Sequence, residues 1–128
     1  MTIVIIKSIK PVFTDERGEI SDLLNEKINH VGFITTKKGV VRAKHYHKQS
    51  TQSSYILKGK FEVIIADPNN LNDKEKFILN AGEIIIIPPN TVHAFKALED
   101  SDMIDMISLS REGAGYEDDV VRVDIEFD

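Results

Sequence analysis

The chain contains the stretch Gly39-Val40-Val41-Arg42-Ala43-Lys44-His45-Tyr46-His47, which runs on through Gln52 to Gly59. Its β-branched residues predict a strand over residues 40–47, followed by a two-stranded hairpin over residues 52–66. Successive side chains of a strand point to opposite faces, so His45 and His47 share one face. If that face is the inner one, both imidazoles point into the protein interior.

The remaining sequence indicates many short strands separated by turns rich in Gly, Pro and Asn. No long amphipathic helix and no alternation of strands with helices is evident. The pattern therefore predicts a single all-β domain over residues 1–128, a sandwich or barrel. Further strands are expected at residues 2–7, 19–24, 31–36, 76–79, 83–87, 92–97, 103–109 and 120–127, with turns at 11–18 and 88–90, a loop at 67–73 and a helical turn at 23–27.

Composition excludes several classes of protein. A net charge of −5 argues against a general nucleic-acid binder. The absence of cysteine excludes disulfides, thiolate ligands and a cysteine nucleophile. The apolar run at residues 2–6 is too short for a signal peptide or a membrane span. A cytoplasmic protein without a membrane partner is the default expectation.

Positive charge is concentrated around the two histidines. Between Lys37 and Lys60 the chain has no Asp or Glu, although the whole sequence is acidic. Such a segment can attract an anionic small molecule; the alternative is that these side chains only protect sheet edges from association. The basic residues of this segment are Lys37, Lys38, Arg42, Lys44, Lys48, Lys58 and Lys60.

A third histidine, His93, follows a turn at residues 88–90, and Gln52 follows the pair after a short polar turn. Neutral imidazoles are good ligands for divalent Zn, Fe, Mn or Ni, so the three histidines are candidate metal ligands. The alternative is that His93 is a hydrogen-bonded core residue. His30 is isolated in the sequence, and we interpret it as a surface or structural residue.

Two spaced motifs resemble those of the cupins. The pattern Gly39-x5-His45-x-His47-x4-Gln52-x6-Gly59 is similar to their first motif, and Gly82-x5-Pro88-x-Asn90-x2-His93 to their second. The resemblance implies a double-stranded β-helix, that is, a jelly-roll barrel, and often a homodimer. It also implies a metal or catalytic site inside the barrel, made by His45, His47, Gln52 and His93.

The sequence departs from the cupin pattern at three positions. Gln52 stands where cupins usually have Glu, Asn90 where they have Gly, and Ala97 where they have Asn. A neutral amide is a poorer ligand for a hard cation than a carboxylate, so metal affinity should be lower or the metal absent. The Asn90 change is mild because Asn tolerates left-handed backbone angles.

A narrower resemblance is to small cupins that act on dTDP-keto-deoxysugars, the 3,5-epimerases and 3,4-ketoisomerases. Three segments carry it, at residues 13–20, 41–48 and 119–127, with Ala43 in place of the usual Gly. It implies proton abstraction next to a ketone by His45 or His47 and a nucleotide-linked sugar as substrate. Tyr116 is the candidate acid, and the candidate substrate-binding residues are Arg17, Arg42, Lys44, Lys48 and Tyr55.

Two conflicts follow from these assignments. In a regular strand Arg42 and Lys44 face away from the histidines, with Val41 and Ala43 on the histidine side, unless a β-bulge intervenes. A metal-bound histidine is also unavailable as a base. Three functions therefore remain open: a sugar-nucleotide epimerase or ketoisomerase, a metal-dependent cupin enzyme such as an oxygenase or small-molecule isomerase, and a non-catalytic ligand-binding cupin.

Overall fold

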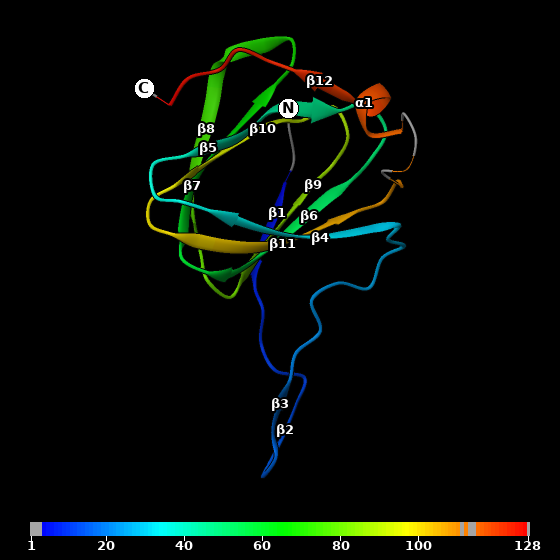
Figure 1. Cartoon of the computed structure of the whole chain (residues 1–128), viewed down its shortest axis with the longest axis vertical. Helices are drawn as coiled ribbons and strands as arrows, with labels where there is room; N and C mark the ends of the chain where they lie inside the picture. Colours follow the sequence, from blue (N-terminus) through cyan, green and yellow to red (C-terminus); the bar gives the residue numbers. More distant parts are fainter. Residues whose placement is uncertain (1–3, 111, 113–114, 128) are drawn as a thin grey trace.

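The computed structural model describes residues 4–110, 112 and 115–127. These residues form twelve strands and one short helix (Figure 1). The elements are β1 (Ile5–Ser8), β2 (Phe13–Asp15), β3 (Gly18–Ile20), β4 (His30–Thr36), β5 (Val41–His47), β6 (Gln52–Lys58), β7 (Lys60–Asp67), β8 (Asn70–Asn80), β9 (Glu83–Ile87), β10 (Val92–Ala97), β11 (Ser101–Ile107), α1 (Gly115–Asp119) and β12 (Val120–Arg122).

Ten of these strands form two antiparallel five-stranded sheets that face each other. One sheet has the order β1-β9-β6-β11-β4, and the other β12-β5-β10-β7-β8. The connection between β4 and β5, and that between β6 and β7, crosses from one sheet to the other, as a jelly roll requires. This arrangement confirms the predicted all-β barrel.

The core lies between the sheets and is made by alternate residues of both. Phe61, Val63 and Phe95 come from one sheet, while Ile56 and Ile85 come from the other, and each is almost fully buried. A second apolar cluster lies on the outer face of the β12-to-β8 sheet, where Ile125 covers it. Most residues of β7 and β10 are buried on both faces, because one face meets the core and the other meets this second cluster.

Several predicted boundaries are confirmed and others are wrong. The strands at 83–87 and 92–97 occur as predicted, but the predicted loop at 67–73 contains the start of β8. The predicted turn at 11–18 and strand at 19–24 are replaced by the β2–β3 hairpin, and residues 23–27 are not helical. The last predicted strand ends at Arg122 instead of Phe127, because the following residues pack over the outer sheet face. The first expected strand begins partly outside the described residues.

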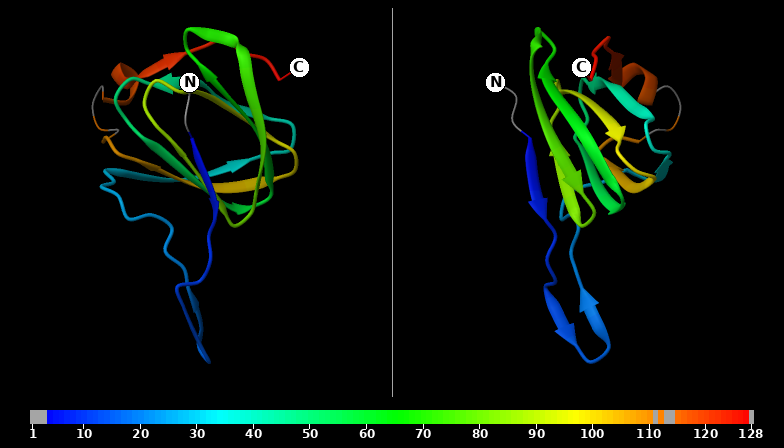
Figure 2. Two further views of the ribbon diagram at one scale, coloured as in Figure 1. Left: turned by 180° about the vertical axis from the view of Figure 1, so that it is seen from behind. Right: turned by 90° about the vertical axis from the view of Figure 1, so that its left-hand side faces the viewer.

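The β2–β3 hairpin extends away from the barrel as an arm (Figures 1 and 2). Apolar side chains on this arm are largely exposed, with Val12 63%, Phe13 51% and Ile20 56% accessible. Asp15 accepts hydrogen bonds from the backbone and guanidinium of Arg17, which closes the hairpin turn. Among the described residues, none belongs to a helix long and apolar enough to cross a membrane.

The turn between β6 and β7 requires glycine at position 59 for two reasons: its backbone conformation is left-handed, and a side chain there would meet Ser101. The φ of Gly59 is 94°, and a Cβ there would lie 2.1 Å from the Ser101 hydroxyl oxygen. Gly82 offers a matched comparison, since its φ is 88° but a Cβ at that position would have no neighbouring atom within 4 Å.

We therefore expect Gly59→Ala to lower the free energy of unfolding more than Gly82→Ala does. Both variants put a side chain on a left-handed residue, at about 1 kcal/mol, and only Gly59→Ala adds a clash, for a total of about 3 kcal/mol. Urea denaturation of the two variants measures the difference. Equal losses would contradict the close packing of Ser101 against Gly59.

Candidate active site

A β-bulge in β5 determines which side chains enter the barrel. His93 of β10 pairs with His45, but Ala94 pairs with Ala43, so Lys44 is an extra residue in β5. Ala43 and Lys44 have φ values of 74° and 58°. The β-bulge that the sequence required for Arg42 to share the site is therefore present, and it brings Arg42 to the same side as His45.

The three histidines of the motifs meet inside the barrel. The ring centroids of His45 and His93 lie 4.8 Å apart, those of His45 and His47 5.0 Å, and those of His47 and His93 5.5 Å. His47 and His93 are buried, while His45 is only partly buried. The predicted convergence of these side chains is present in the structure.

Two of the imidazoles are fixed by hydrogen bonds from their Nδ1 atoms. His93 Nδ1 donates to the Thr91 carbonyl at 2.9 Å, and His47 Nδ1 donates to Asp119 Oδ2 at 3.0 Å. Asp119 itself accepts hydrogen bonds from the Gln49 backbone N–H and the Ser50 hydroxyl. Because carbonyl and carboxylate oxygens only accept, both rings carry the Nδ1 proton and direct Nε2 toward each other.

Gln52 lies between these two Nε2 atoms. Its Oε1 is 3.0 Å from His47 Nε2 and 3.1 Å from His93 Nε2. On its other side, Gln52 Nε2 donates to the Ser54 hydroxyl at 3.0 Å, and that hydroxyl donates to Asp105 Oδ1 at 2.5 Å. A buried hydrogen-bonded chain thus joins Asp105 to Gln52, whose Oε1 faces the histidine cluster.

Burial and mutual repulsion keep two of the histidines neutral. Burial, with the nearby His47, lowers the pKa of His45 to about 4, and burial together with His45 lowers the pKa of His93 to about 3. Burial alone would raise the pKa of Asp119, but the hydrogen bonds from Ser50, Gln49 and His47 outweigh it and leave this pKa below its usual value. At neutral pH the cluster therefore contains two neutral imidazoles beside an ionised carboxylate.

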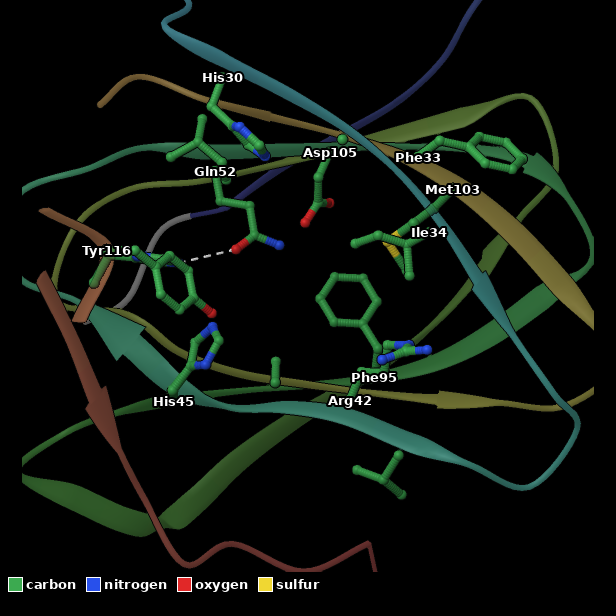
Figure 3. A pocket seen from close by; sticks show the side chains of 15 residues that line it. His30, Phe33, Ile34, Arg42, His45, Gln52, Phe95, Met103, Asp105 and Tyr116 are labelled. Carbon is green, nitrogen blue, oxygen red and sulfur yellow. Dashed lines mark hydrogen bonds between the residues drawn. The ribbon is translucent and has the colours of Figure 1, made fainter. Parts of the chain in front are cut away.

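A cavity of about 620 Å³ opens in front of the histidines. Arg42 lines it and is held by hydrogen bonds to Thr36 Oγ1 at 2.9 Å and to the Thr35 carbonyl at 2.8 Å. Tyr116 of α1 lines the same cavity, and its hydroxyl points toward His45 (Figure 3). The cavity therefore combines a guanidinium, a phenol and imidazoles on one surface.

The other predicted substrate-binding residues lie outside this cavity in the described chain. Lys44 is turned away by the bulge, with its ammonium 3.7 Å from Glu126, and Lys48 is exposed beyond the end of β5. Tyr55 lies on the outer face of its sheet, because its neighbours Gln52, Ser54 and Ile56 occupy the inner face. Arg17 lies far from the cavity at the tip of the arm and is paired with Asp15.

Three cavity or cluster residues were not predicted from the sequence. Asp119 begins one of the three segments that resemble the deoxysugar cupins, but nothing in the sequence pattern indicates its contact with His47. Asp105 reaches the site only through the pairing of β11 with β6. His30, interpreted from sequence as a surface or structural residue, lines the cavity, where Gly32 leaves room for its ring.

The donor set fits a divalent transition metal. One nitrogen from each of His45, His47 and His93 lies within 4.8 Å of the others. Gln52 Oε1 adds an oxygen, and the Nδ1 anchors of His47 and His93 orient two of the rings as metal-binding histidines require. These four residues would hold the ion.

Comparison with known proteins shows the family. The sequence profile of the family described as Cupin matches residues 20–121, so the chain belongs to the cupins. No curated protein sequence matches it.

Solved structures share the fold at low identity. The chain resembles a 3,4-ketoisomerase from Helicobacter canadensis, with TM-score 0.78, 20% identity, and coverage of 95% of this chain and 92% of that chain. It also resembles a double mutant of the QdtA 3,4-ketoisomerase from Thermoanaerobacterium thermosaccharolyticum in complex with TDP, with TM-score 0.74, 23% identity, and coverage of 93% and 86%. A third similar structure is the dTDP-4-dehydrorhamnose 3,5-epimerase from Sulfolobus tokodaii, with TM-score 0.69, 24% identity, and coverage of 86% and 72%.

The lowered histidine pKa values predict that acid destabilises the metal-free protein. Unfolded histidines bind protons near pH 6.5, whereas His45 and His93 bind them only near pH 4 and 3. Their contribution to stability is thus present above about pH 6.5 and lost as pH falls toward 4. Urea denaturation in the presence of a chelator should show a loss of up to about 1.4 kcal/mol per pH unit for each group.

The control is His45→Gln, which removes one of the two titrating groups. Its stability should fall less steeply over the same range. A wild-type stability that does not change between about pH 6.5 and 4.5, or identical slopes for the two proteins, would contradict the neutral state of His45.

Proposed function

We propose that this cupin is a sugar-nucleotide epimerase or ketoisomerase that begins by removing a proton next to a ketone. The observation that carries the proposal is the cavity in which His45, His47, Tyr116 and Arg42 line one surface. Similar solved structures include a 3,4-ketoisomerase with TDP and one with TDP-4-keto-6-deoxyglucose. Such chemistry needs a base, an acid and a site for an anion, and the cavity offers each.

Proton transfer is assigned to the pair His45 and His47. His45 is neutral, partly exposed to the cavity, and therefore able to accept a proton. His47 has a carboxylate partner in Asp119, which orients the ring and stabilises positive charge on it. We assign the return of a proton to the sugar to Tyr116, because its hydroxyl points toward His45 (Figure 3).

The anionic parts of the substrate require positive charge at the cavity. Arg42 supports this role because its guanidinium lines the cavity and is held in place by Thr35 and Thr36. A guanidinium can bind a diphosphate through two parallel hydrogen bonds. We therefore assign recognition of the diphosphate to Arg42 rather than to Lys44 or Lys48.

A metal-dependent cupin enzyme is the second candidate function, favoured by the donor set of three histidines and Gln52. A bound divalent ion would polarise a carbonyl oxygen and stabilise a negative charge that forms on it. Binding through His45 removes that residue as a base. The two functions therefore make opposite demands on His45.

We also propose that the protein is a homodimer. Residues paired across the β1-to-β4 sheet form one row on its outer face that is apolar except for one serine: Ile5, Ile86, Ser53, Met106 and Val31. Ile5 and Val31 are 52% and 63% exposed, and Leu57 on β6 is 51% exposed. An apolar sheet face of this kind suits a self-complementary interface. Arg17, at the tip of the arm, lies far from the cavity of its own chain. We therefore propose that Arg17 binds substrate, as predicted, only in the cavity of the other subunit of the dimer.

No nucleic-acid or membrane partner is proposed for this acidic chain. We further propose a cytoplasmic location, which the absence of cysteine supports.

The function predicts exchange of carbon-bound hydrogen with solvent. Incubation with dTDP-4-keto-6-deoxyglucose in deuterated water should introduce deuterium next to the ketone, detected by mass spectrometry and NMR. His45→Asn and His47→Asn should each slow this exchange by at least about 100-fold, because each removes a group of the proton-transfer pair. Tyr46→Phe, on the opposite face of the same strand, should leave the rate within about two-fold.

Binding of dTDP, measured by calorimetry, separates recognition from chemistry. Arg42→Gln should weaken it by about ten-fold or more, because a charged hydrogen-bonding partner of the diphosphate is lost. Absence of both deuterium uptake and dTDP binding would overturn the proposed function. Stoichiometric Zn, Fe, Mn or Ni together with turnover of a non-nucleotide substrate would then select the metal-dependent enzyme. Ligand binding that survives without any turnover would select the non-catalytic cupin.

The homodimer is tested by sedimentation velocity. The wild type should sediment as a dimer, and the double variant V31K/L57K should be monomeric, because it puts two charges on the apolar face. Ile78→Lys is the control, since Ile78 is 49% exposed but lies on the other sheet. A monomeric wild type, or a double variant that remains dimeric, would contradict this interface.

A further inference from the structure

The orientation of the Gln52 side chain decides what the histidine cluster can bind. A glutamine amide has an acceptor end, Oε1, and a donor end, Nε2, of almost the same shape. With Oε1 toward the histidines, the cluster has an oxygen ligand. With Nε2 toward them, it has two N–H donors that satisfy the imidazole lone pairs and repel a cation.

His93 by itself favours the donor end of the amide. Its proton lies on Nδ1, because that atom faces the Thr91 carbonyl, and burial keeps the ring neutral. Its Nε2 atom therefore presents a lone pair to Gln52. An amide oxygen 3.1 Å from that atom is unfavourable unless a proton or metal cation lies between them.

The opposite side of the amide imposes the orientation that is observed. The Asp105 carboxylate can only accept, so the Ser54 hydroxyl must donate its one proton to it. The Ser54 oxygen can then only accept from Gln52, which requires the amide NH₂ on that side. Ser54 is fully buried, so water does not offer an alternative partner.

We propose that Asp105 and Ser54 are positioning residues that fix the Gln52 amide with its oxygen toward the histidines. The chain thereby retains an oxygen ligand at the position where its family usually has a carboxylate, and the negative charge moves outward to Asp105. This role requires no particular substrate, so it stands or falls independently of the proposed sugar-nucleotide chemistry.

The orientation is tested by NMR on labelled, chelator-treated protein. In the wild type, the Gln52 side-chain NH₂ protons should show nuclear Overhauser effects to the Ser54 β-protons and not to the His47 and His93 ring protons. In Ser54→Ala the NH₂ group loses its acceptor, and these effects should move to the ring protons. Ser54→Thr keeps the hydroxyl and should retain the wild-type pattern.

Cobalt binding provides a second measurement in the same variants. Ser54→Ala should weaken Co²⁺ binding at least ten-fold. Asp105→Asn should weaken it less, because an asparagine side chain can donate or accept and so no longer forces the Ser54 hydroxyl to donate away from Gln52. Ser53→Ala, one residue away on the opposite sheet face, is the matched control and should leave both measurements unchanged.

The nuclear Overhauser effects of the Gln52 NH₂ protons test the orientation of the amide even if cobalt binds weakly to every variant. Contacts to the histidine rings in the wild type, or an unchanged pattern in Ser54→Ala, would overturn the proposal.

Discussion

The pairing of β5 with β10 is the interaction on which the rest of the site depends. It places His45 directly opposite His93, and the extra residue of the bulge brings Arg42 into the cavity. Two non-glycine residues with positive φ carry the local conformational cost. Such strain is tolerated where the surrounding sheet fixes the backbone, and here it allows the imidazole of His45 and the guanidinium of Arg42 to face one cavity.

The hydrogen bonds behind the histidines show how the buried polar groups are stabilised. The rings of His47 and His93 each have a hydrogen-bond acceptor at Nδ1. The Gln52 amide is held by Ser54 on the side that faces away from these rings. In the described residues no buried side-chain N or O atom lacks a partner. The hydrogen bonds at Nδ1 restrict the rings to one geometry, and a single broken link leaves a costly unpaired group.

Much of the barrel was predictable because period-two patterns and turn residues are local signals. The strands ending in His47 and Ala97 and the convergence of His45, His47 and His93 follow from these signals and from the cupin resemblance. The sequence raised a β-bulge only as a condition for Arg42 to reach the site; its position at Lys44 was not predictable, since nothing in Val41–His47 indicates a residue without a pairing partner. Asp119 and Asp105 were missed because long-range contacts, of α1 with β5 and of β11 with β6, bring them to the site.

In the proposed function, the cavity receives a nucleotide-linked sugar with its diphosphate at Arg42 and its sugar toward His45 and His47. A crystal structure of the protein with dTDP bound tests this most directly. We expect diphosphate oxygens within hydrogen-bonding distance of the Arg42 guanidinium and free space for a sugar in front of the histidines. Diphosphate bound elsewhere on the barrel, or a nucleotide that blocks the histidines, would contradict it.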